Sequence, residues 1–126
     1  MTVALRTALI WDDEVMEDRV FRRPQPITLG AAGRTTFVIP ELGLPPVFAI
    51  IAPGARGYVL TLGEHMRGTI CIAGVEHDIA AFVRADSADG YRATPIGGRD
   101  WGVIELAPSG QHKLFFQFVA PEVPAR

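Results

Sequence analysis

The histidines are the first side chains to consider for acid–base or metal chemistry, and their spacing favours neither. His65, His77 and His112 are separated by 12 and 35 residues, without the His-x-x-x-His spacing that holds a metal on a helix. His77 and Asp78 are neighbours in a predicted strand, so their side chains point to opposite faces and cannot form an orienting pair.

The sequence around the single cysteine and around the main acidic run favours a structural role over a catalytic one. Cys71 lies between Ile70 and Ile72, an apolar setting typical of an inert thiol. Asp12-Asp13-Glu14 follows an apolar run without a paired histidine, which favours a solvated hairpin tip over a metal or carboxylate site. We therefore predict no catalytic residue, no metal site, no cofactor and no small-molecule substrate, and we expect that the protein is not an enzyme.

Composition indicates one globular domain. The 126 residues are 48% hydrophobic and 21% charged, with a net charge of −2. This charge, without a basic block, argues against a nucleic-acid partner. A single cysteine fits a reducing compartment, and no run approaches the ~20 apolar residues of a membrane span, so a cytoplasmic location without membrane insertion is expected. We place a domain over residues 1–120 and the start of a Pro-rich linker or tail over 121–126.

Short β runs between turn residues fill the chain, which predicts an all-β fold, a two-sheet β-sandwich of about eleven strands. Residues 80–84 are either a short helical turn or an irregular link. The expected strands cover residues 3–10, 15–21, 27–29, 37–39, 47–52, 58–62, 70–72, 75–79, 91–96, 101–106 and 111–119. The alternating apolar residues predict a core of Leu29, Val38, Ile50, Leu60, Leu62, Ile70, Ile72, Ile104, Leu114, Phe116 and Phe118.

The segment 26–49 resembles the signature of the forkhead-associated (FHA) domain. In that family an apolar strand ends in Gly-Arg-Ser, a second strand ends in Pro, and a Ser-x-x-His turn follows; Gly30 and Pro40 match. Four phosphate-handling positions of the family carry other residues here: Ala31, Ala32, Pro45 and Phe48. The resemblance therefore implies an FHA-like sandwich whose phosphothreonine site has lost its charge-assisted donors.

A second block resembles the same family. Arg67-Gly68-Thr69 stands where the family has Asn-Gly-Thr, and Ala73-Gly74 stands at its Asn-Gly turn. The first of those asparagines binds the phosphopeptide backbone in the family, and Arg67 cannot replace it because a guanidinium only donates. We expect phosphothreonine peptides to bind no better than their unphosphorylated forms.

Two functional hypotheses follow. The first is a phospho-independent protein-interaction module that docks an unidentified protein partner through its loops, with Leu44 and Phe48 as anchors and Arg34 at a polar rim. The alternative for this apolar loop, that it folds onto the sandwich and completes the core, stays open. If another face is used, the outer sheet around Glu17 and Arg19 is the next candidate. The predicted partner-binding residues are Arg34, Leu42, Leu44, Pro45 and Phe48.

The second hypothesis is an anion or phosphopeptide sensor. It requires Arg34, Arg67 and Arg99 to gather at the loop tips, whereas the alternative is that they are ordinary solvated arginines.

A narrower resemblance concerns the order of the segments. A strand, an acidic turn, an Arg-containing strand and a Phe-Gln-Phe-Val strand before a Pro-rich exit are similar to the cytoplasmic FHA-like domains of TonB-like gliding-motility proteins of myxobacteria. This resemblance implies a docking part of a cell-envelope machine, in which the domain precedes a linker and a membrane span.

Overall fold

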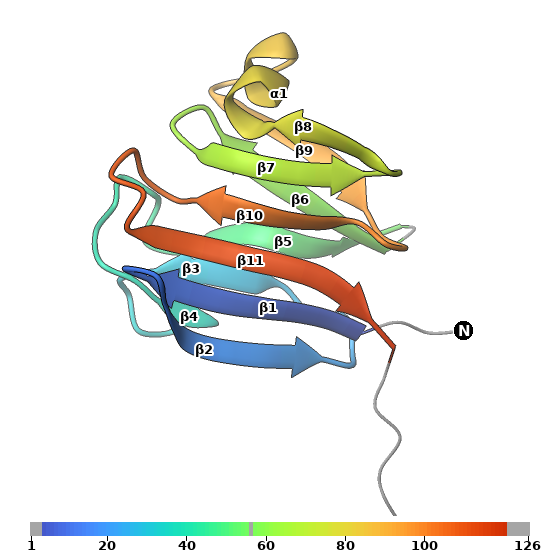
Figure 1. Ribbon diagram of the computed structural model, residues 1–126. Helices are drawn as coiled ribbons and strands as arrows, with labels where there is room; N and C mark the ends of the chain where they lie inside the picture. Colours follow the sequence, from blue (N-terminus) through green and yellow to red (C-terminus); the bar gives the residue numbers. More distant parts are fainter. Residues whose placement is uncertain (1–3, 56, 121–126) are drawn as a thin grey trace, which may run out of the picture.

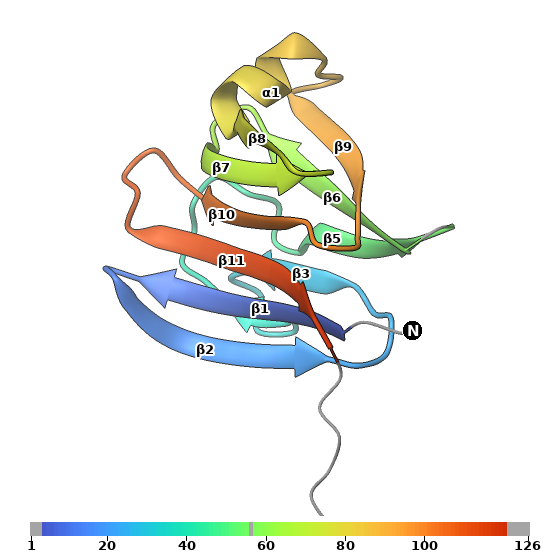
Figure 2. The ribbon, with the colours of Figure 1, turned by 45° about the vertical axis from the view of Figure 1, so that its right-hand side comes forward.

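Eleven strands and one short helix form a two-layer β-sandwich, as the sequence predicted. The computed structural model describes residues 4–55 and 57–120. Figure 1 shows the two sheets stacked face to face, and Figure 2 shows the helix beside one edge of the stack. The linker predicted over 121–126 lies outside the described residues, as does Val3 at the start of the first predicted strand.

The larger sheet has six strands in the order β2-β1-β11-β10-β7-β8, and each neighbouring pair is antiparallel. Ala4 of β1 pairs with Val119 of β11, so the first and last described strands lie side by side. The strands are β1 (Ala4–Trp11), β2 (Glu14–Phe21), β7 (Arg67–Ile72), β8 (Val75–Asp78), β10 (Trp101–Glu105) and β11 (His112–Val119).

The smaller sheet has five strands in the order β4-β3-β5-β6-β9. All its pairs are antiparallel except β3 with β4, which is parallel. Because β3 and β4 are parallel, the chain must run back along β3 before β4 begins. Thr36 lies on this returning segment beside Thr28, whose amide donates a hydrogen bond to the Thr36 Oγ1 at 3.0 Å. The strands are β3 (Ile27–Gly30), β4 (Phe37–Val38), β5 (Phe48–Gly54), β6 (Gly57–Gly63) and β9 (Tyr91–Ile96).

The helix α1 (Ile79–Ala85) follows β8 and confirms the helical alternative for residues 80–84. The Asp78 carboxylate accepts a hydrogen bond from the Ala81 amide at 3.0 Å, a usual N-cap contact. Ile79, Phe82 and Val83 are buried, so the helix closes the β8 and β9 side of the sandwich.

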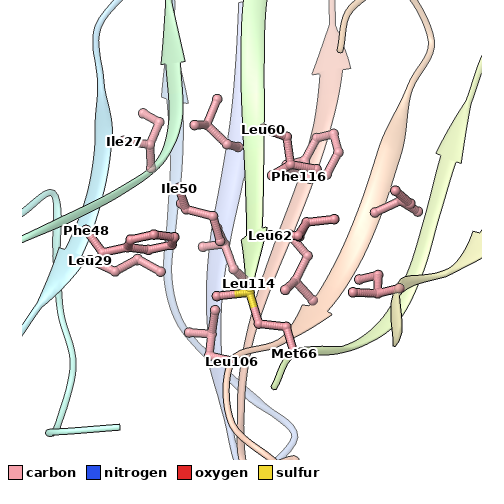
Figure 3. Close-up of a cluster of buried hydrophobic side chains, with 14 of the residues drawn as sticks. Ile27, Leu29, Phe48, Ile50, Leu60, Leu62, Met66, Leu106, Leu114 and Phe116 are labelled. Carbon is pink, nitrogen blue, oxygen red and sulfur yellow. The ribbon is translucent and has the colours of Figure 1, made fainter. Parts of the chain in front are cut away.

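The core fills the space between the sheets (Figure 3). Ile72 and Phe118, both predicted to be core residues, are partly buried and pack against it. Eight other predicted core residues are buried, which confirms the alternation used to choose them: Leu29, Ile50, Leu60, Leu62, Ile70, Ile104, Leu114 and Phe116.

Two local predictions were wrong. Val38, expected in the core, is 55% exposed, because its neighbours Phe37 and Ile39 take the inward positions and a strand alternates its faces. Residues 67–69, left outside the expected strand 70–72, begin strand β7. Gly68 has a φ of 119°, and a Cβ at this position would lie 2.1 Å from the Val103 carbonyl oxygen, so both its conformation and this contact require glycine.

No helix among the described residues has the length and apolar character needed to cross a membrane.

Candidate functional site

Four connections lie together at one end of the sandwich, on the left in Figure 1, and we call this the loop end. They are residues 12–13, 39–47, 64–66 and 106–111. The strand registers agree, since Trp11 pairs with His112 and Glu105 pairs with Arg67 at this end. Loops held on rigid sheets are common places for binding residues.

The positions that handle phosphate in the resembled family offer little to an anion here. Ala31 and Pro45 are exposed and have no side-chain donor, and Phe48 points into the core. The Arg67 guanidinium donates through Nη1 to the carbonyl oxygens of Glu64 at 3.1 Å and Met66 at 3.0 Å. This arginine is therefore engaged by its own turn.

The loop 39–47 folds down onto the sandwich, and this corrects the expectation that it exposes Leu44 and Phe48 as anchors. Leu44 is 7% and Phe48 8% exposed, and both belong to the core. Close contact explains the burial: a Cβ at Gly30 would lie 1.8 Å from the Pro46 carbonyl oxygen, so the backbone of β3 supports the loop directly. Leu44 and Phe48 therefore follow the alternative prediction, in which the loop packs on the sandwich and completes the core.

The other predicted partner-binding residues are more accessible. Leu42 is partly buried against the core, whereas Arg34 and Pro45 are exposed. Whether a partner touches them stays a prediction.

Two of the three arginines predicted to gather around an anion are held apart. Arg67 begins β7, and Arg99 precedes Trp101, which pairs with Cys71 near the other end of the same strand. Four residues of strand at about 3.3 Å each separate these two ends by about 13 Å. Arg67 and Arg99 therefore do not form one anion site.

An apolar groove opens at the loop end, between the β1–β2 hairpin and the segment that continues from β4. Its volume is about 250 Å³. Trp11 and Met16 are 48% and 49% exposed, and Val38 is exposed on the facing side. The lining residues are Leu9, Trp11, Met16, Glu17, Val38, Ile39, Pro40 and His112.

Two strand features create the β1–β2 wall of the groove. Asp12 and Asp13 both have positive φ, 53° and 68°, so the hairpin reverses in two residues and places Trp11 at its very end. The register shifts between Leu9 and Ile10, and Met16 has no partner on β1. Such a bulge redirects side chains locally, and here both Met16 and Glu17 line the groove.

His112 forms the inner wall. Its ring stacks on Trp11 with centroids 5.4 Å apart and an interplanar angle of 18°. The residue is only 7% exposed, and within residues 4–55 and 57–120 neither ring nitrogen has a hydrogen-bond partner. A buried polar group without a partner costs about 1–3 kcal/mol, so His112 is a feature that a bound ligand could complete.

Arg19 closes the sandwich edge next to the groove. Its Cζ lies 4.9 Å from the ring centroid of Phe21 and 5.9 Å from that of Phe37, and its Nη1 donates to the Thr36 carbonyl oxygen at 3.1 Å. These contacts join β2 to β4. Arg19 is therefore occupied by the fold, and the groove ends at this bridge.

The outer face of β2 carries a separate ion pair. Arg6 donates to both carboxylate oxygens of Asp18, at 3.0 Å from Nε and 2.6 Å from Nη2. This hydrogen bonding lowers the pKa of Asp18 below its ordinary value of 3.8. The pair faces away from the groove and takes no part in it, because Arg6 and Asp18 alternate with the inward residues Thr7 and Glu17.

Most of this groove was not predicted from the sequence. The acidic hairpin tip was predicted to be a solvated turn, and Glu17 was proposed only as part of a second-choice binding face. A tryptophan directly before a two-residue acidic turn was an available signal for an exposed aromatic side chain. The bulge at Met16 and the burial of His112 had no such signal.

Comparison with known proteins identifies no relative: no protein-family model, curated protein or solved structure matches this chain. The groove and the geometry of the loop end are therefore the observations that bear on function.

Proposed function

We propose that this chain is a docking module that binds a protein partner without phosphate, through the apolar groove at its loop end. The observation that carries the proposal is the groove itself, where the exposed Trp11, Met16 and Val38 surround a buried histidine whose ring nitrogens have no partner among the described residues. Exposed aromatic and Met side chains around a concavity are typical of protein-binding surfaces.

The state of the loop end supports a phospho-independent mode. A phosphothreonine needs charge-assisted donors, each worth roughly 1.5–3 kcal/mol. Ala31 and Pro45 supply none, and Arg67 already donates to two carbonyl oxygens. Removing two or three such bonds lowers an ordinary affinity by several orders of magnitude.

The docking function fits a degenerate FHA domain. The resemblance implied an FHA-like sandwich, and a two-sheet β-sandwich is compatible with it. Gly30 and Pro40, the positions that match the signature, lie where the loop packs on β3 and where the groove begins. Under this proposal the domain works in the cytoplasm, as a docking part of an envelope or gliding-motility machine.

Affinity capture with matched variants tests the docking function. Trp11→Asp puts a charge in the groove, and Val75→Asp puts the same charge at an exposed valine on β8, the opposite edge of the same sheet. We expect quantitative capture from the source-cell lysate to lose a partner with Trp11→Asp and keep it with Val75→Asp. Both variants should melt within a few degrees of the parent protein, because exposed substitutions cost little stability.

Phosphatase treatment of the lysate supplies the second arm. Capture should be unchanged after treatment. The proposal is wrong if capture is equal for the two variants, or if dephosphorylation abolishes it.

A further inference from the structure

We infer that the groove receives an extended segment of the partner in which an apolar side chain stands next to lysine or arginine. This inference rests on the proposed docking function and deepens it by giving the chemistry of the partner. Three properties of the groove carry it: its volume, the buried His112, and the charge of its rim.

The volume fits one side chain. At about 250 Å³, the groove is smaller than the roughly 300–1,000 Å³ of sites that enclose small molecules. Leu9, Trp11, Met16 and Ile39 give it apolar walls. An apolar or aromatic side chain of a passing peptide matches both the space and its lining.

His112 requires a partner that both donates and accepts. A neutral imidazole carries one N–H donor and one acceptor nitrogen, and both ring nitrogens are buried without a partner in the described structure. A peptide main chain presents N–H and C=O groups in alternation along an extended segment. Each ring nitrogen exposes less than 1 Å² beside the stacked Trp11, so an extended segment reaches this ring when the indole, which is 48% exposed, moves aside. A purely apolar ligand would satisfy neither nitrogen.

The rim of the groove is acidic. Glu17 lines the groove, Glu14 pairs with Trp11 across the hairpin, and Glu41 follows the lining residue Pro40. Among the described residues these three glutamates form no salt bridge, although Glu41 accepts a hydrogen bond from the Gly43 amide at 3.2 Å. The nearby cations are engaged, because Lys113 lies 3.7 Å from Asp13 and Arg19 is held against Phe21 and Phe37. Complementary charge steers association and suppresses wrong partners, so this rim favours a cationic neighbour beside the inserted side chain.

A second copy of this chain is a poorer occupant. It would bring its own acidic hairpin tip against the rim, and the charges would repel. Pairing of two β2 edges is also opposed by the bulge at Met16 and by the charged side chains along the strand, both of which protect edges.

Selection from a displayed library of random nonapeptides tests the inference on the full chain. The parent protein should enrich peptides with an apolar or aromatic residue adjacent to Lys or Arg. Glu17→Lys should remove the preference for cations. Its matched control is Glu76→Lys, an exposed glutamate on β8 at the opposite edge of the sheet, which should keep that preference.

The role of His112 is tested with a selected peptide. His112→Phe keeps an aromatic ring under Trp11 and removes both nitrogens. We expect the dissociation constant, measured by calorimetry, to rise about three- to tenfold, as for one lost hydrogen bond. Thermal melting should show that the variant folds, and Trp11→Asp should abolish binding of the same peptide.

The possible results separate this inference from the docking function. Enrichment of acidic or uncharged peptides, or equal behaviour of Glu17→Lys and Glu76→Lys, overturns the basic partner even if Trp11-dependent capture succeeds. Sedimentation showing a dimer that Trp11→Asp dissociates assigns the groove to a second copy and also overturns the inference. Failure of both Trp11-dependent capture and peptide enrichment overturns the docking function itself.

Discussion

Leu44 and His112 lie at the same end of the sandwich and contribute to it in opposite ways. Leu44 fills a space that the sheets leave open, and its burial fixes the loop 39–47. His112 is as well buried, yet its ring nitrogens have no partner among the described residues. One side chain therefore completes the fold, while the other keeps polar atoms that no described residue satisfies.

Leu44→Asp should unfold or strongly destabilise the domain. The substitution removes a buried apolar side chain and introduces a buried charge, which together cost at least about 3 kcal/mol. Chemical denaturation followed by circular dichroism measures the change. The control is Val47→Asp in the same loop, where the side chain is exposed and the expected change is within about 0.5 kcal/mol. Equal stability of the two variants would mean that the loop does not pack on the core.

At the scale of elements, one carboxylate ties the β7–β8 turn to the connection that runs from β9 to β10. Asp100 is buried before β10, and its Oδ1 accepts from the Ala73 amide at 2.9 Å while its Oδ2 accepts from the Gly97 amide at 3.0 Å. Ala73 lies in the β7–β8 turn of the larger sheet, and Gly97 follows β9 of the smaller one. One side chain thus links the two layers at the end opposite the groove.

Asp100→Ala should destabilise the domain by about 2–4 kcal/mol, because it leaves two amides without their charged acceptor. Glu76→Ala, an exposed carboxylate on the neighbouring strand β8, is the control and should change stability by less than about 0.5 kcal/mol. Thermal unfolding of both variants measures the difference. A similar melting temperature for the two would contradict the linking role of Asp100.

Strands could be predicted where apolar residues alternate over a long run. β11 was predicted within a residue of its bounds, because its alternating run has one buried face. β4 has only two residues, and so short a segment does not reveal which side chain points inward, which is why Val38 was misplaced. Leu44 and Phe48 escaped prediction as core residues because their burial depends on contact between the loop and Gly30.

The candidate site was harder to predict than the fold for the same reason. The loss of phosphate donors was visible in single residues such as Ala31 and Pro45. The groove instead combines residues distant in the sequence, with Trp11 stacked on His112 and Val38 facing both from the other sheet. This arrangement depends on the order of the strands in the sheets and on a β-bulge, and the local spacing of apolar residues predicts neither of them.

At the scale of the whole molecule, the two sheets differ in extent, and this difference produces the groove. The larger sheet continues through β1 to β2, whereas the smaller sheet ends in the two residues of β4. The inward face of the β1–β2 hairpin is therefore not covered by a strand of the smaller sheet, and only Arg19 bridges it to β4. A partner segment bound at this edge would lie where the smaller sheet has no strand.

Circular permutation tests this arrangement. Ala4 and Val119 are paired across β1 and β11, so their Cα atoms are about 5 Å apart and a short Gly-Ser linker can join these ends. The ends of β5 and β6, where Gly54 pairs with Gly57, lie at the end away from the groove, and new termini can be opened between these two residues (Figure 1). Termini opened between Asp12 and Asp13 cut the hairpin that holds Trp11 in place.

We expect both permutants to fold, since each retains all eleven strands and the buried core, and β2 is exposed along most of its length. The β5–β6 permutant should keep the affinity of the parent chain for a selected apolar–basic nonapeptide. The Asp12–Asp13 permutant should bind this peptide at least about tenfold more weakly, because the Trp11 side chain is no longer held over His112 and must be ordered when the peptide binds.

Circular dichroism establishes whether each permutant folds, and calorimetry gives the affinities. Equal affinities would show that the peptide binds away from the β1–β2 hairpin, and an unfolded β5–β6 permutant would contradict the adjacency of the first and last strands.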